Sequence, residues 1–152
     1  MANWTDIMAT IEFSNMFELK HYLQEHWKGN SEYNIYNYET TLDDNTFHIS
    51  GEGRWETNRN ELVCDAQQFN PTRIHIVESE PGNDFFTEYE EVNGDIICDY
   101  STTYFSPESI AHYGLDFFMY LFEDYTSPLD IPDYYAEPLC KAGYSLMDVI
   151  HT

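Results

Sequence analysis

Carboxylate side chains surround the Asn93-Gly94 dipeptide, and their spacing could support a defined chemistry. Asn-Gly between two runs of strand-forming residues is typical of a β-hairpin with a two-residue turn. The two-residue period of a strand then places Glu88, Glu90, Asp95 and Asp99 on one face, and Tyr89, Ile96, Cys98 and Tyr100 on the other. Successive carboxylates on one face are about 6.5–7 Å apart, close to the spacing of phosphates along a nucleic-acid strand. The predicted chemistry is ion pairing with arginine and lysine side chains of a partner.

Negative charge is concentrated in the second half of the chain. Residues 74–140 contain fifteen Asp or Glu and no Lys or Arg, in a protein of 152 residues with a formal net charge of −22. Repulsion among like charges destabilises a compact fold, and ordinary surfaces mix both signs. A strongly positive partner is therefore expected. The alternative is a solvated acidic face without a partner, which is the usual meaning of a charge run.

Two further groups of acids extend the predicted binding surface. Just upstream of the hairpin lie Glu78, Glu80 and Asp84. Beyond it lie Glu123, Asp124, Asp130 and Asp133, interleaved with Tyr125, Tyr134 and Tyr135. Carboxylates mixed with exposed tyrosines are typical of a protein interface. Tyrosines that pack the C-terminal segment onto a sheet would explain the same pattern, so both interpretations stay open.

The hydrophobic pattern predicts which elements position these side chains. Strands are expected at 4–13, 32–40, 46–51 and 73–77, with helices between Ser14 and Gly29 and at 57–69. Hairpin strands follow at 85–92 and 95–100, then a helix from Pro107 to about Tyr125, a proline-rich irregular stretch, and a short helix at 144–150. The order β-α-β-β-α-β predicts an α+β fold with a ferredoxin-like antiparallel sheet backed by two helices. The hairpin and a C-terminal helical extension are added to it.

Length and composition favour one folded domain over residues 1–152. An aromatic content of 17% argues against disorder despite the charge. The expected parts are a ferredoxin-like core at 1–80, the acidic hairpin at 81–105 and the C-terminal extension at 106–152. Three widely spaced cysteines, Cys64, Cys98 and Cys140, predict reduced thiols. Neither a signal peptide nor a membrane span is apparent, so a cytoplasmic protein that does not bind membranes is expected.

Three short motifs carry a resemblance to a known family. They are Ala2-Asn3-Trp4 before the first strand, Gly53-Arg54-Trp55 before the second helix, and Glu80-Pro81-Gly82 after the fourth strand. In order and spacing they resemble the ferredoxin-like family of small phage and plasmid proteins, whose members have no assigned general activity. The resemblance covers about residues 1–100. It implies an origin on a mobile element, and therefore a defence nuclease of the host as the class of target.

Other chemistries find little support in the residues. His48 and His75 lie on predicted strands and could meet in space, but no Cys or His pair has zinc-site spacing and no calcium loop is present. No phosphate-binding loop or nucleophile–base motif indicates an enzyme. The chain also lacks the basic footprint of a direct nucleic-acid binder. We therefore expect no enzymatic activity, no metal and no cofactor.

The leading hypothesis is nucleic-acid mimicry by a phage or mobile-element protein. Its carboxylates would replace DNA or RNA phosphates in the basic groove of a host defence enzyme and inhibit it competitively, as anti-CRISPR or anti-restriction proteins do. The alternative is an acidic adaptor that docks a basic partner which does not bind nucleic acid. Halophilic adaptation is a third possibility, but it predicts evenly spread charge, whereas the first half of this chain is much milder.

Overall fold

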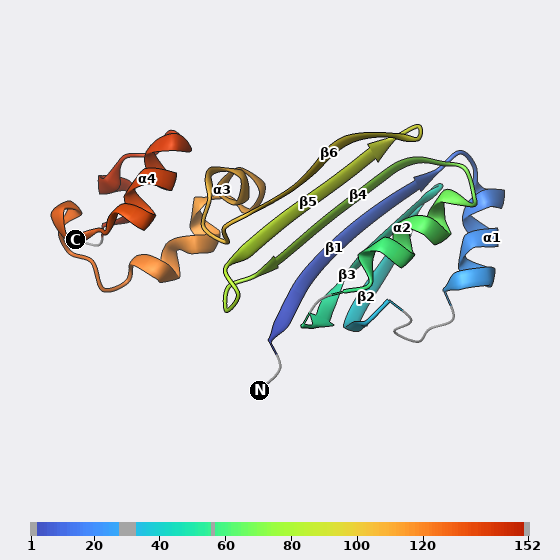
Figure 1. Ribbon diagram of the computed structural model, residues 1–152, viewed down its shortest axis with the longest axis horizontal. Helices are drawn as coiled ribbons and strands as arrows, with labels where there is room; N and C mark the ends of the chain where they lie inside the picture. The colour runs from blue at the N-terminus through green and yellow to red at the C-terminus, as the bar shows by residue number, and fades with distance from the viewer. Residues whose placement is uncertain (1–2, 28–32, 56, 151–152) are drawn as a thin grey trace. The chain divides into compact units, whose positions relative to one another are not determined.

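The computed structural model describes residues 3–27, 33–55 and 57–150. Its elements, with η marking a 3-10 helix, are β1 (Trp4–Phe13), α1 (Met16–His26), β2 (Ile35–Asp43), β3 (Thr46–Arg54), α2 (Arg59–Gln67), β4 (Pro71–Glu80), β5 (Phe85–Val92), β6 (Asp95–Thr102), α3 (Pro107–Tyr113), η1 (Leu115–Phe122), η2 (Pro128–Asp130), α4 (Asp133–Lys141) and η3 (Leu146–Val149). The predicted α+β class is confirmed (Figure 1). None of the helices in the described ranges is long and apolar enough to cross a membrane.

Two compact units divide the chain. The first comprises Met1–Asn83 and Thr87–Ser101, and the second comprises Asp84–Phe86 and Thr102–Thr152. Each unit has its own cluster of buried hydrophobic side chains. The single domain over residues 1–152 stays a prediction, and most of the predicted acidic hairpin lies in the first unit.

The sheet contains six strands in the order β2-β3-β1-β4-β5-β6. β1 pairs antiparallel with both β3 and β4, so that Ala9 lies opposite Ile49 on one side and Ile76 on the other. The alternating sequence of β1 explains its central place, because its odd-numbered residues are buried and its even-numbered residues face the opposite side. β4 runs from Pro71 to Glu80, longer than the predicted 73–77, because it pairs with β1 along most of its length.

Helices α1 and α2 cover one face of this sheet (Figure 1). Their buried side chains are Leu19 and Tyr22 from α1, and Leu62, Val63 and Ala66 from α2. Asn15 caps α1 by accepting a hydrogen bond from the Glu18 amide at 2.9 Å, one residue after the predicted start at Ser14. The predicted end at Gly29 lies outside the described residues, and the helix ends at His26.

The second unit departs from the prediction in two places. The helix expected from Pro107 to about Tyr125 ends at Tyr113, because Gly114 has a φ of 86°, a left-handed conformation that no α-helix contains. The chain continues as the 3-10 helix η1. The stretch expected to be irregular contains α4, which begins directly after Pro132 and includes Pro138. Proline breaks the interior of a helix but is well tolerated at its start, so Pro132 is compatible with the start of α4.

Candidate partner-binding surfaces

Glu88 and Glu90 of β5 are held by side chains of the neighbouring strand β4. Glu88 Oε2 lies 2.6 Å from His75 Nε2, and Glu90 Oε2 lies 2.6 Å from Arg73 Nε. The two glutamate side chains are only 24% and 21% exposed. In the sequence, Arg73 comes directly before the acidic stretch of residues 74–140, and His75 lies at its start. The pairing of β4 with β5 places their side chains next to Glu90 and Glu88. These two carboxylates are therefore partnered within the protein.

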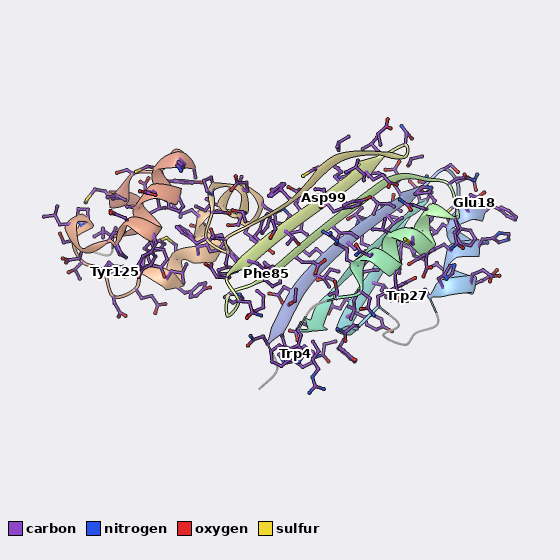
Figure 2. All side chains as sticks on the ribbon, in the orientation of Figure 1. Trp4, Glu18, Trp27, Phe85, Asp99 and Tyr125 are labelled. Carbon is purple, nitrogen blue, oxygen red and sulfur yellow. The ribbon has the colours of Figure 1, made fainter. Side chains whose placement is uncertain are left out.

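Asp99 of β6, labelled in Figure 2, lies on the edge strand of the sheet. Its side chain is near a different cation, Arg59 of α2. Arg59 Nη2 is 3.8 Å from Asp99 Oδ1, and Arg59 Nε is 3.8 Å from Glu78 Oε1. The Arg59 guanidinium carbon also lies 5.4 Å from the ring centre of Tyr89, which belongs to the hydrophobic core. Since α2 covers the core face of the sheet, the Asp99 side chain belongs to that face.

The predicted division of the hairpin into two faces is therefore wrong for Asp99 and Tyr100. Tyr100 was predicted on the other face of the hairpin from Glu88, but it donates a hydrogen bond to Glu88 Oε1 at 2.8 Å. Asp99 was predicted on the same face as Glu88, but its side chain lies near Arg59. The prediction assumed that side chains alternate between the two faces without interruption through both strands of the hairpin. A change of one residue in the alignment of β6 with β5 reverses which of their side chains share a face. Glu88, Glu90, Asp95 and Asp99 do not form one row.

Three glutamates of this region are buried, so they are not on the surface. Glu78 is 6%, Glu80 4% and Glu91 3% exposed. The Glu80 carboxylate accepts hydrogen bonds from the backbone amides of Gly82, at 2.6 Å, and Asn83, which fixes the turn after β4. Glu78 and Glu80 were predicted as partner-binding residues, and their burial leaves little of either carboxylate accessible to a partner in this conformation.

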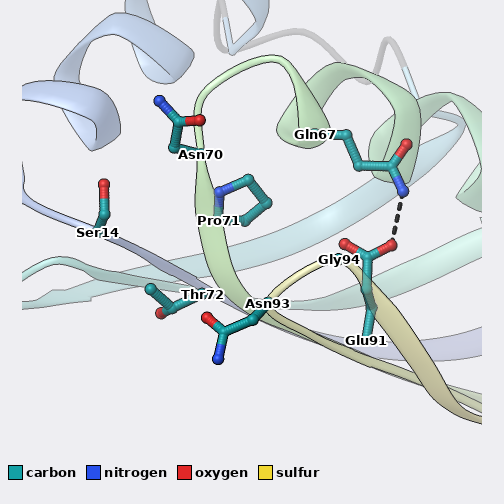
Figure 3. Close-up of a pocket in the computed structure, with 8 residues that line it drawn as sticks. All are labelled: Ser14, Gln67, Asn70, Pro71, Thr72, Glu91, Asn93 and Gly94. Atoms are coloured by element: carbon teal, nitrogen blue, oxygen red, sulfur yellow. Dashed lines mark hydrogen bonds between the residues drawn. The ribbon is translucent and has the colours of Figure 1, made fainter.

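Glu91 lines a polar pocket at the end of the sheet (Figure 3). Gln67 Nε2 donates to Glu91 Oε1 at 2.6 Å, and the Tyr89 hydroxyl donates to the same oxygen at 3.0 Å. Burial, together with the hydrogen bond to Glu91, raises the pKa of Tyr89 to about 12. Both donors fix the carboxylate inside the protein, and the other lining side chains are neutral. We therefore interpret the pocket as a structural feature of the end of the sheet.

The two remaining acids of the predicted surface are exposed. Asp95 lies at the start of β6, directly after the Asn93-Gly94 turn. The φ angles of Asn93 and Gly94, 50° and 87°, fit the predicted two-residue turn. Asp84 has a structural role as well, because its Oδ1 accepts a hydrogen bond from the Tyr104 amide at 3.0 Å in the second unit.

Five acids of the second unit have exposed side chains. We call Glu123, Asp124, Asp130, Asp133 and Glu137 the C-terminal acidic surface. Among the described residues, none of the five has a Lys, Arg or His nitrogen within 4.0 Å. Asp133 and Glu137 are four residues apart on α4, so they share one helix face although like charges at that spacing repel. The structure thus leaves uncompensated charge here.

The sequence left open whether the tyrosines near the C-terminal acidic surface are exposed at an interface or packed in the core. The structure contains tyrosines of both kinds. Tyr125 and Tyr135 pack against the buried ring of Phe122, with ring centroids 6.3 Å and 5.1 Å away. Tyr134, in contrast, is 67% exposed, and Leu129 is 93% exposed. Tyr125 and Tyr135 therefore belong to the core, whereas Tyr134 and Leu129 add apolar area beside the carboxylates.

A second exposed group was missed by the sequence reasoning. On the sheet face opposite α1 and α2, Trp4 and Tyr36 are 44% and 40% exposed, and their rings meet edge to face at 5.9 Å. Asp6 and Glu52 lie directly opposite each other in the β1–β3 pair. The sequence pattern of β1 could have indicated this group, because the even-numbered residues Trp4 and Asp6 alternate with the odd-numbered residues of the core. We call Trp4, Asp6, Tyr36 and Glu52 the aromatic–acidic corner.

Replacing Asp6 with Asn is expected to stabilise the protein at neutral pH. Burial, and the negative charges of Glu52 and Glu80, raise the Asp6 pKa above its ordinary value of 3.8. The folded state therefore favours the neutral acid, and this stabilisation is full below the ordinary pKa and is lost as pH rises through the raised pKa. We expect a gain of a few tenths to about 1 kcal/mol at pH 7 that vanishes near pH 3, measured by urea unfolding. A gain that persists at pH 3 would show a cause other than charge.

The histidines that could have met in space are separated by a strand. His48 of β3 and His75 of β4 both lie opposite Thr10 of β1, which stands between them. Thr10 Oγ1 is 3.1 Å from His48 Nδ1. Within the described ranges, no group of three or more His, Cys, Asp or Glu side chains could hold a metal ion.

Comparisons with models of protein families, with curated proteins and with solved structures find no match to this chain.

Proposed function

We propose that the protein is an acidic binding protein that occupies the basic, nucleic-acid-binding groove of another protein and inhibits it by competition. The observation that carries this proposal is the C-terminal acidic surface, whose five carboxylates are exposed and, in the described part of the chain, unpaired with any cation within 4.0 Å. Arginine and lysine that normally bind phosphates would pair with these carboxylates, and arginine can do so bidentately.

The location of the surface differs from the one the hairpin suggested. Carboxylates already held by Arg59, Arg73 and His75 would have to leave those partners before binding another protein. The C-terminal acidic surface has no such cost. A net charge of −22 would also accelerate encounter with a positive groove, with strong dependence on salt. A folded scaffold would lose less ordering entropy than a flexible polyanion does.

The narrower assignments are part of the same proposal. The strand order β2-β3-β1-β4, with α1 and α2 on one face, supports a ferredoxin-like assignment for the first four strands. With the motif resemblance, this supports a phage or plasmid origin and action in the host cytoplasm. A defence nuclease of the restriction or CRISPR type is then the target class, which makes the protein an anti-restriction or anti-CRISPR inhibitor.

A second candidate function is favoured by one observation. Leu129 and Tyr134 are 93% and 67% exposed beside the carboxylates. A polyanion mimic needs no apolar contact, whereas a protein interface gains most of its free energy from such side chains. The protein would then be an adaptor that docks a basic partner which does not bind nucleic acid.

Affinity capture from bacterial lysate at low salt, followed by measurement of the dissociation constant for each captured protein, tests the two candidates. Mimicry predicts a nucleic-acid-binding partner that added DNA or RNA displaces. The adaptor function predicts a partner that is indifferent to nucleic acid. Either interaction should weaken by at least about 100-fold when Glu123, Asp124, Asp130 and Asp133 are changed to their amides.

The matched control neutralises the same number of exposed acids in the first unit. Glu25, Glu39, Asp43 and Asp44 are exposed, and amides at these positions remove the same total charge. We expect this variant to lose only the part of the affinity that depends on net charge, seen as a small decrease in association rate. Equal loss in both variants would contradict a binding site on the C-terminal acidic surface.

A further inference from the structure

We propose that the aromatic–acidic corner is a second docking surface, which binds an arginine side chain presented by a partner protein. It lies on the first unit, so it is independent of the C-terminal acidic surface and of the function proposed for it. The four residues come from three adjacent strands, because Trp4 and Asp6 belong to β1, Glu52 to β3 and Tyr36 to β2. Trp4 lies near the N-terminal end of β1 (Figure 2).

The strand register brings the four side chains together. Glu52 lies opposite Asp6 in the β1–β3 pair and opposite Tyr36 in the β2–β3 pair. Tyr36, Glu52 and Asp6 therefore form one row across three strands. The Trp4 ring meets the Tyr36 ring at 5.9 Å with an interplanar angle of 86°. Two aromatic rings thus lie next to two carboxylates on a sheet face that α1 and α2 leave uncovered.

Charge complementarity identifies the occupant as a cation. Like charges directly opposite each other in a sheet destabilise it, so the Asp6–Glu52 pair favours binding of a positive group. Arg54 lies opposite Trp4 on the same sheet face, two residues from Glu52, but it forms no ion pair within 4.0 Å among the described residues. Two carboxylates against this one arginine leave the corner with a negative charge.

The rings specify arginine among possible cations. A guanidinium group is planar, stacks on tryptophan and tyrosine, and can donate two parallel hydrogen bonds to a carboxylate. Lysine offers a compact, strongly hydrated charge without the planar surface. Exposed fractions of 44% for Trp4 and 40% for Tyr36 leave ring surface available to a partner. An arginine side chain can thus contact ring and carboxylate at the same time.

NMR titration with the peptide acetyl-Gly-Arg-Gly-Arg-Gly-amide, in low salt, tests this inference. The indole N–H signal of Trp4 should shift and saturate, whereas that of Trp27, which packs against Tyr33 and Phe47, should not move. The same peptide with lysine should bind about tenfold more weakly, and with glutamine it should not bind. Equal binding of the arginine and lysine peptides would overturn the arginine assignment.

Two variants separate the corner from general attraction to an acidic protein. Changing Asp6 to Asn and Glu52 to Gln should weaken arginine-peptide binding at Trp4 at least about tenfold, and removal of their repulsion should leave the fold intact. The variant with four amides in the C-terminal acidic surface should bind the peptide at Trp4 as the original does. Equal weakening in both variants would overturn the proposal, and so would a Trp4 signal that moves with protein concentration alone, since a second copy would then occupy the corner.

Discussion

Replacing Arg59 with Met is expected to lower the free energy of unfolding by about 3 kcal/mol. Arg59 lies beside the buried carboxylate of Glu78 on the core face of the sheet, with 3.8 Å between Arg59 Nε and Glu78 Oε1. Loss of the guanidinium removes a positive charge that offsets this poorly solvated negative charge, which costs more than the pair itself contributes. Asp99 adds little, because its side chain is 52% exposed.

Helix electrostatics alone would predict the opposite result. Arg59 is the first residue of α2, and a positive charge at a helix N-terminus is unfavourable. Its removal should therefore stabilise the helix slightly. A net loss of about 3 kcal/mol would show that the contacts with the sheet outweigh the helix dipole.

Urea unfolding of three variants tests this prediction. Arg54→Met removes the same charge from an exposed position at the end of β3 and should change the stability by no more than about 0.5 kcal/mol. Adding Glu78→Gln to Arg59→Met should restore part of the lost stability, because the buried charge is then gone. A loss of equal size in Arg54→Met would attribute the whole effect to net charge.

The first four strands and two helices could be predicted because their signals are local. The period-two pattern of β1 predicted its bounds, Trp4–Phe13, and the turn at Asn93-Gly94 predicted the bounds of β5. Boundaries elsewhere moved by a few residues. Each of these features depends on neighbours in sequence, which a pattern of hydrophobic residues records directly.

The binding surface of the hairpin could not be predicted in the same way. Residues 74–140 do contain fifteen acids and no Lys or Arg. However, the fold brings cations from other parts of the sequence next to some of these acids. Arg59 reaches the sheet from α2, and Arg73 pairs with Glu90 through the alignment of β4 and β5. Among the described residues, the five acids of the C-terminal acidic surface have no such long-range partner within 4.0 Å. A charge run in sequence therefore overstates the charge that a fold leaves available.

Phe118→Ala is expected to unfold the second unit while the first stays folded. The Phe118 side chain is fully buried, and it meets Tyr104 and Phe105 edge to face at 5.3 Å and 5.2 Å. Truncating a buried phenylalanine costs about 3–5 kcal/mol. The second unit has its own hydrophobic cluster, separate from that of the first. A unit this small has a low free energy of unfolding, so the destabilisation caused by Phe118→Ala should exceed it.

Phe117 provides a matched control, because it is the adjacent residue of the same type and is 43% exposed. Its ring stacks on Tyr113 at 4.4 Å, so Phe117→Ala should cost only about 1 kcal/mol. Hydrogen exchange measured by mass spectrometry should show loss of protection over residues 102–150 in Phe118→Ala alone, with residues 4–80 protected in both variants. Equal loss of protection in both regions would show that the chain unfolds as one cooperative structure. Selective loss would mean that the C-terminal acidic surface depends on a core separate from that of the aromatic–acidic corner, so the two proposed surfaces could be tested one at a time.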